Sequence, residues 1–200
     1  MADVKRVLIL PDIHYPYEDR PACAAVLKYA ATEKWDQVVQ LGDLLDMNSI
    51  SDFNEGKPKL VEGERLAQDY AYVNKKLDEW QQATPGAKWT ILSGNHEFRV
   101  DRYVEKHPAV EGLVEPEHGL NFEKRGIRYI RCYPTGELAK CGKAYFTHGS
   151  WANDLHAKRH VDTFGVNIIY GHTHQVQIYS KKQHGKNKTL MGISLGCLCR

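Results

Sequence analysis

Seven aspartate, asparagine and histidine side chains have the types and spacing expected of metal ligands, each after a short apolar run. A mixed set of oxygen and imidazole donors suits divalent transition metals, whereas a zinc finger needs thiolates and a calcium loop needs oxygens alone. In an extended segment the side chains of residues i and i+2 point the same way. The two side chains of Asp12-x-His14 can therefore reach one region, and so can those of His172-x-His174. The pattern predicts a site for two metal ions, with the ligands Asp12, His14, Asp43, Asn95, His148, His172 and His174.

The run Gly94-Asn95-His96-Glu97 adds a group that can exchange a proton. Gly94 permits a sharp turn after an apolar stretch, and His96 can carry a proton near neutral pH. Glu97 is interpreted as a structural acid that anchors the loop. Simpler roles remain open: Asn95 as a turn former, and the aspartates as helix caps between a strand and a following helix.

These side chains require elements that deliver them to one place, and the expected elements are short buried strands alternating with helices. Ligands of such α/β sheets gather at the carboxyl ends of the strands. We expect strands at 4–10, 37–41, 88–92, 125–133, 138–146 and 166–170, and a hairpin of 176–179 and 189–195 around a tip at 181–188. We expect helices at 21–34 (capped by Asp19), 60–82, 98–116 (broken by Pro108) and 152–164.

Length and composition describe an ordinary globular protein. Two hundred residues fit a single domain, 1–200, and the 42% hydrophobic and 26% charged content exclude a disordered or membrane chain. Lys and Arg (27) barely outnumber Asp and Glu (25), so no overall basic field demands nucleic acid. The N-terminal apolar run is too short for a signal or a membrane span, which predicts a cytoplasmic protein. The five cysteines are expected to be free thiols.

Five blocks, in this order, give the sequence a resemblance to a known family. Asp12-x-His14, Gly42-Asp43, Gly94-Asn95-His96-Glu97, His148-Gly149 and Gly171-His172-Thr173-His174 resemble the signature blocks of the calcineurin-like metallophosphoesterase superfamily. The blocks span positions 12 to 174, and the short length, with Arg99 after the third block, is most similar to small bacterial and phage-encoded members. The resemblance implies a layered α/β/β/α sandwich of two mixed sheets flanked by helices.

The resemblance also implies a division of labour among the residues. It implies one metal held by Asp12, His14, Asp43 and His174, and a second held by Asp43, Asn95, His148 and His172, with Asp43 shared. A hydroxide bridging the metals would attack phosphorus in line, without a phosphoenzyme. His96 would then protonate the leaving group, and Asp46 would orient its imidazole and favour its protonated form.

The expected activity is hydrolysis of a phosphomonoester or phosphodiester, with a nuclease or cyclic-nucleotide phosphodiesterase as the alternative. In the protein-phosphatase branch of the family an arginine directly follows the acid that corresponds to Asp46. Here Met47 stands in its place, which argues against phosphoproteins as substrates. The balanced charge argues against long duplex DNA and permits a nucleotide or a short single strand. A catalytically silent, protein-binding scaffold is the candidate of a different class. No membrane association is expected, and the sequence identifies no protein partner.

The metal and the substrate contacts are less closely determined. Nitrogen and oxygen ligands suit Mn²⁺ first, with iron, zinc, cobalt or nickel also compatible. Arg99 is a candidate phosphate contact, because a guanidinium fork matches two phosphoryl oxygens. His156 and Arg159 on the expected helix 152–164 form either a basic rim for the substrate or a solvated helix face, on which His160 would also lie.

Overall fold

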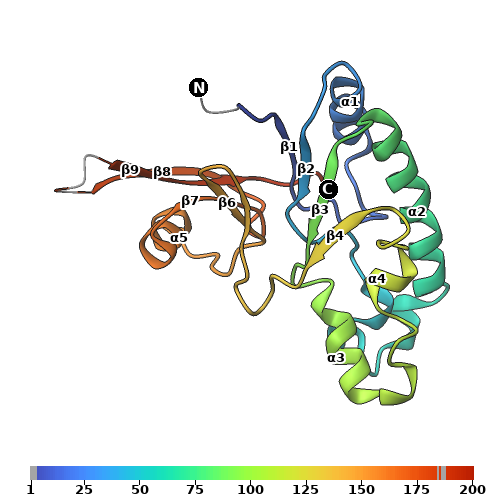
Figure 1. The fold of residues 1–200 in the computed structure, drawn as a ribbon. Coiled ribbons are helices and arrows are strands. Elements are labelled where there is room, and N and C mark those ends of the chain that lie inside the picture. Colours follow the sequence, from blue (N-terminus) through green and yellow to red (C-terminus); the bar gives the residue numbers. More distant parts are fainter. Residues whose placement is uncertain (1–3, 184, 186–187) are drawn as a thin grey trace.

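The computed structural model describes residues 4–183, 185 and 188–200, and it contains two β-sheets that pack against each other (Figure 1). The strands of the first sheet are in the order β1-β2-β3-β4, and every pairing is parallel. The predicted layered α/β fold is confirmed, but this sheet is purely parallel and not mixed. A helical crossover follows each strand except the last, and such crossovers join parallel neighbours. Its strands are β1 (Val7–Leu10), β2 (Gln37–Gln40), β3 (Lys88–Leu92) and β4 (Ile127–Ile130).

The second sheet is mixed, with the strand order β5-β6-β7-β9-β8. β6, β7 and β9 are parallel, while β5 and β8 pair antiparallel with β6 and β9 at the two edges. The sheet comprises β5 (Ala139–Cys141), β6 (Ala144–Thr147), β7 (Asn167–Tyr170), β8 (Val176–Gln183) and β9 (Lys188–Leu195). The predicted hairpin is therefore longer than expected, and positions 184, 186 and 187 of its predicted tip lie outside the described residues.

Helices cover the outer face of each sheet. α1 (Arg20–Ala30), α2 (Leu66–Ala83) and α4 (Pro116–Gly119) lie on the side of the first sheet away from the second, and α5 (His156–Phe164) lies against the second sheet (Figure 1). α3 (Phe98–Lys106) follows β3, and short 3₁₀ helices span Asn48–Ile50, Asp52–Asn54, Pro58–Val61 and Pro108–Val110. Asp19 caps α1 as predicted, because its side chain accepts a hydrogen bond from the Ala22 amide at 3.0 Å.

Two predicted helices begin later than the sequence pattern indicated. The helix expected at 60–82 begins at Leu66, because the chain before it makes a 3₁₀ turn and Gly63 takes a positive φ of 83°. The helix expected at 152–164 begins at His156. The segment expected as a strand at 125–133 is regular only over Ile127–Ile130.

The core lies in layers on both faces of each sheet. Leu10, Ile91 and Trp80 belong to the cluster between the first sheet and its helices. Val39 and Phe146 belong to the cluster between the two sheets. A smaller cluster of Val161, Ile168 and Leu190 attaches α5 to the second sheet. Packing on both faces explains the continuous apolar run of β1, whose Leu8 and Leu10 belong to the first cluster while Val7 and Ile9 pack against the second. The packing fixes the carboxyl ends of strands from both sheets relative to one another.

Candidate metal centre

The predicted ligands all follow the carboxyl ends of parallel strands. Asp12 and His14 follow β1, Asp43 follows β2, and Asn95 follows β3 in the first sheet. The second sheet contributes His148 after β6, and His172 and His174 after β7. Hydrogen bonds join the two groups: the His172 amide donates to Asp12 Oδ1 at 2.8 Å. The structure thus brings side chains from both sheets into one cluster.

The backbone of this cluster has an unusual conformation. Residues other than glycine rarely take positive φ angles, which cost free energy and are concentrated at functional sites. Most of the predicted ligands nevertheless have φ in this region: Asp12 (21°), His14 (53°), Asp43 (52°), His172 (70°) and His174 (55°). The strand-end turns hold these side chains in position at a cost of about 1–3 kcal/mol for each such residue.

One part of the cluster is formed by Asn95, His148, His172 and Asp43. Asn95 Oδ1 lies 2.9 Å from His148 Nε2 and 2.8 Å from His172 Nδ1. His148 Nδ1 lies 3.0 Å from the Leu41 carbonyl, which can only accept, so this nitrogen carries a proton and Nε2 is the nitrogen that faces the cluster. Asp43 Oδ2 is 3.4 Å from the same Nε2.

The other part is formed by Asp12, His14 and His174 around the same aspartate. His14 Nε2 lies 3.1 Å from His174 Nε2 and 3.5 Å from Asp43 Oδ2. Asp12 Oδ1 is 3.8 Å from His174 Nε2. Because Asp43 Oδ2 approaches both His14 and His148, the two parts meet at this carboxylate.

The donor set fits cations. Asp12 is fully buried, and its Oδ2 has no hydrogen-bond partner within the part of the chain that the structure describes. Burial raises the pKa of Asp12 to about 7, although nearby histidines oppose the change. Asp43 is equally buried, yet His148, His96 and His14 outweigh the burial and lower its pKa. Acceptor atoms that face one another with few donors between them are stable only beside positive charge.

His96 lies next to this cluster and contacts Asp46. The Nδ1 of His96 is 2.7 Å from the Asp46 carbonyl and 3.3 Å from the Asp46 carboxylate. The backbone amide of His96 donates a hydrogen bond to Asp43 Oδ1 at 2.9 Å. Burial lowers the pKa of His96, but the hydrogen bond with Asp46 and the charge of Asp43 outweigh it, so the net pKa is raised. The imidazole is therefore biased toward its protonated form.

Glu97 fastens the loops that carry the cluster. It is 2% exposed, and its carboxylate accepts backbone hydrogen bonds from Asp43 (2.9 Å), Leu45 (3.1 Å) and Gly94 (2.8 Å). This is the anchoring role that its position in the sequence predicted. The carboxylate joins the turn after β2 to the turn after β3.

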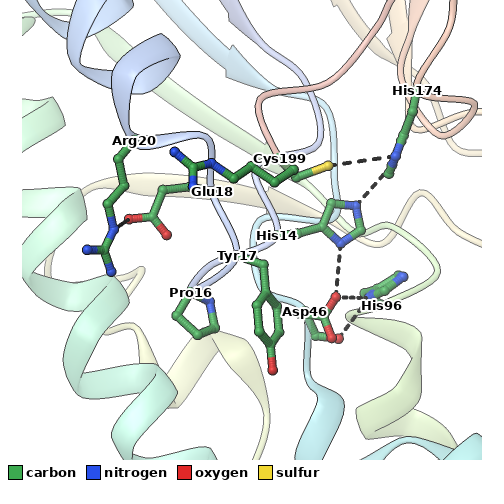
Figure 2. Close-up of a pocket in the computed structure, with 10 residues that line it drawn as sticks. His14, Pro16, Tyr17, Glu18, Arg20, Asp46, His96, His174 and Cys199 are labelled. Carbon is green, nitrogen blue, oxygen red and sulfur yellow. Dashed lines mark hydrogen bonds and ion pairs between the residues drawn. The ribbon is translucent and has the colours of Figure 1, made fainter.

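A cavity of about 570 Å³ opens beside the cluster (Figure 2). Four residues of the cluster and its neighbour line it, namely His14, Asp46, His96 and His174, and the rest of the lining is Pro16, Tyr17, Glu18, Arg20, Cys199 and Arg200. No pattern in the sequence predicted that Cys199 would lie here. Its Sγ is 3.7 Å from His174 Nδ1, because the chain after β9 runs along the loop after β1, where Leu198 N donates to the Asp12 carbonyl.

The predicted substrate contacts lie apart from this cavity or point inward. Arg99 contacts Asp46 and His96, with Nη1 2.7 Å from the Asp46 carbonyl and Nη2 3.2 Å from His96 Nε2.

His156 is 1% exposed, and its Nδ1 lies 2.6 Å from the Tyr170 hydroxyl, so it forms neither the expected rim nor a solvated face. His160 is likewise buried against Tyr170, because this face of α5 packs on the second sheet. The Arg159 guanidinium lies over the Trp151 ring, 4.7 Å from its centroid. Substrate contact by Arg99 and Arg159 stays a prediction, whereas the expectation for His156 is corrected, because a buried side chain has no surface for such a contact.

Comparison with known proteins gives a family match over most of the chain. The family model described as calcineurin-like phosphoesterase matches residues 5–176. The "Gene 54 protein" of Mycobacterium phage L5 is 26% identical over 208 aligned positions, covering 97% of this chain and 79% of the relative. The protein of the same name from Mycobacterium phage D29 is 25% identical with the same coverage.

Two solved structures match most of this chain at low sequence identity. Vacuolar protein sorting 29 from Cryptosporidium parvum is 15% identical, with 98% of this chain and 76% of that chain covered and a TM-score of 0.49. The nuclease MPE of Pseudomonas putida is 14% identical, with coverages of 96% and 72% and a TM-score of 0.46. Among the described residues there is no helix whose length and hydrophobicity would suffice to cross a membrane.

Proposed function

The chain belongs to the calcineurin-like phosphoesterase family, and from this premise we propose that it is a dinuclear metal-dependent phosphoesterase. Its reaction is the hydrolysis of phosphomonoester or phosphodiester bonds. One observation carries the proposal: seven predicted ligands from two sheets converge, and Asp43 Oδ2 lies within 3.5 Å of an imidazole of each predicted metal position. A shared carboxylate suits two adjacent divalent ions.

The proposed ligand sets assign the residues to two positions. Asp12, His14, Asp43 and His174 hold one ion, and Asp43, Asn95, His148 and His172 hold the other. When bound, two divalent cations supply a Lewis acid that lowers the pKa of water and neutralises phosphoryl charge. The surrounding protein holds the imidazole tautomers: the Leu41 carbonyl fixes His148 with its Nε2 lone pair directed inward.

His96 is proposed as the general acid. It lies beside the cluster, and Asp46 keeps its Nδ1 occupied, so Nε2 is the ring nitrogen left to exchange a proton. Once a substrate phosphoryl group draws the Arg99 guanidinium away from it, this Nε2 gives its proton to the leaving-group oxygen. Arg99 Nη2 lies 3.2 Å from this Nε2 and can contact a phosphoryl oxygen that enters beside it. Protonation of the leaving group by a positioned histidine contributes about 10²–10⁴-fold.

The cavity favours a second candidate of the same chemistry, a nuclease or cyclic-nucleotide phosphodiesterase. Its volume of about 570 Å³ gives room for a nucleoside beside His96, and Tyr17 offers a 44% exposed ring on its wall. Exposed aromatic rings near a phosphate site stack nucleobases. We therefore include nucleotides and short single strands of nucleic acid among the proposed substrates.

Hydrolysis of model esters tests the proposal. Metal-free protein is supplied with Mn²⁺, and in parallel with iron, zinc, cobalt or nickel, and is assayed on bis-p-nitrophenyl phosphate and p-nitrophenyl phosphate. We expect turnover with the wild type, most with Mn²⁺, and none after EDTA treatment. Nucleotides, cyclic nucleotides, single-stranded DNA and phosphopeptides then identify the substrate. Both esters left intact with every metal would favour the silent scaffold instead.

Asp43→Ala is the matched inactive variant. Because Asp43 is the carboxylate that both positions share, its loss is expected to remove both ions and all turnover. Metal analysis by plasma mass spectrometry checks this outcome. One ion still tightly bound would contradict the bridging role of Asp43.

A further inference from the structure

The carboxylate of Asp46 lies between two imidazoles that the proposed function treats separately (Figure 2). Its Oδ2 is 3.3 Å from His14 Nδ1 and also 3.3 Å from His96 Nδ1. His14 belongs to the proposed ligands, and His96 is the proposed proton donor. The Asp46 side chain is 18% exposed, so water screens both contacts only partly.

His96 has a closer partner than this carboxylate. The main-chain carbonyl of Asp46 is 2.7 Å from His96 Nδ1, the ordinary length of a hydrogen bond, and a carbonyl oxygen can only accept. Asp46 Oδ1 faces Arg99 Nη1 at 3.4 Å. Since the carbonyl alone can hold the His96 N–H, Oδ2 is left to receive the N–H of His14.

The other nitrogen of His14 faces the proposed metal position. Its Nε2 is 3.1 Å from His174 Nε2 and 3.5 Å from Asp43 Oδ2. His148 is built in the same way, with Nδ1 on the Leu41 carbonyl and Nε2 in the cluster. An imidazole that donates its outer N–H to a fixed acceptor keeps its inner lone pair directed at the ion.

We infer that the Asp46 carboxylate positions His14 as a metal ligand, in addition to its contact with His96. One side chain then sets both the metal affinity of the first position and the orientation of the proton donor. The inference rests on the proposed function only in taking His14 as a metal ligand.

Metal binding by the full chain tests the inference without reference to turnover. Metal-free wild type, Asp46→Asn and His96→Gln are titrated with Mn²⁺ by isothermal calorimetry. We expect two binding events in the wild type and a loss of about 10–100-fold in one of them for Asp46→Asn, the usual effect of removing such a partner of a ligand. His96→Gln keeps the Asp46–His14 contact, so both affinities are expected to stay unchanged.

Two results would overturn the inference. Wild-type affinities in Asp46→Asn would mean that the carboxylate serves His96 alone, and an equal loss in His96→Gln would mean that any change in this loop weakens the ion. A third measurement needs no variant: long-range ¹H–¹⁵N NMR of the Zn²⁺-loaded wild type must find the His14 proton on Nδ1, and a proton on Nε2 would refute the inference. A chain that shows the Asp46→Asn loss but hydrolyses no ester would retain the inference and refute the proposed function.

Discussion

At the scale of single residues, the surroundings decide what each histidine can do. Burial lowers the pKa of His148, yet Asp43 and Asp12 outweigh it and raise the value to about 9. Burial, together with the charge of His148, lowers the pKa of His172 to about 4. His160 carries the same side chain, but it lies on α5, buried and stacked on the ring of Tyr170. Residue type alone therefore does not tell which of these histidines is a candidate metal ligand and which belongs to the packing.

His96→Ala is expected to retain both ions and to lose about 10²–10⁴-fold in kcat on esters with poor leaving groups. The metals remain because His96 contacts Asp43 through its backbone amide, which alanine keeps. Alkyl and p-nitrophenyl esters of the same phosphate are compared by initial rates. An equal loss on the activated p-nitrophenyl ester would contradict a proton-donor role.

Asp46→Asn is expected to shift the pH–rate profile toward lower pH. The raised pKa of His96 keeps its acid form present above its ordinary value of 6.5, so turnover falls only as pH rises through that raised pKa. Removing the carboxylate charge lowers the His96 pKa, and the alkaline limb then moves to lower pH. Rates are measured at saturating Mn²⁺, so that weaker metal binding does not contribute. An unchanged limb would argue against the pairing.

At the scale of elements, the turns after β3 and β7 leave no room for a side chain beside the proposed metal ligands. Gly94 follows β3 and Gly171 follows β7, and a Cβ at either position would overlap the carboxylate of Asp43 or Asp12 respectively. Neither glycine has a positive φ, so space and not backbone conformation demands glycine here. The close approach of backbone to carboxylate is what lets two neighbouring loops share one site.

Gly171→Ala is expected to lower metal content and turnover sharply, because the added methyl group displaces Asp12. Gly192→Ala on β9 is the matched control: its Cβ would meet Val161 Cγ2 at 2.7 Å beneath α5, away from the ligands. The control is expected to lower the thermal midpoint, with little change in metal per folded chain. Metal analysis and differential scanning calorimetry of both variants check this. Full metal occupancy in Gly171→Ala would contradict the crowding argument.

At the scale of the whole molecule, the proposed centre lies across the junction of two sheets. Asp12, His14, Asp43 and Asn95 come from the first sheet, and His148, His172 and His174 come from the second. The apolar cluster between the sheets, which includes Phe146, fixes the two sets of ligands relative to each other. Metal affinity and the stability of the sheet packing are therefore linked, since an ion bound across the junction stabilises only the folded chain.

Phe146→Ala is expected to lower the free energy of unfolding by about 3–5 kcal/mol, because it leaves a cavity between the sheets. Phe53→Ala is the control, since this ring is 80% exposed and its loss is expected to change stability little. Urea unfolding with EDTA and with excess Mn²⁺ measures both. We expect Mn²⁺ to raise the stability of each folded variant, and no effect of Mn²⁺ on the wild type would contradict a centre that joins the sheets.

The sequence by itself determined where strands occur along the chain and which residues follow them. Short apolar runs such as 88–92 and the polar turns after them are local patterns, so β3 begins and ends at the predicted residues. The Asp19 cap was predictable for the same reason, because a capping side chain bonds to an amide three residues away. The spacing of the ligands within single turns likewise predicted which side chains lie at the strand ends.

Only the tertiary structure decided which distant atoms meet. Asp46 Oδ2 contacts His14 from 32 positions away, and Cys199 reaches His174 because the last segment pairs with the loop after β1. The same holds for His156, whose burial depends on the face of α5 that packs on the second sheet. Helical or strand periodicity reports only neighbours along the chain, whereas burial and hydrogen-bond partners depend on how two sheets pack, and no local pattern encodes that packing.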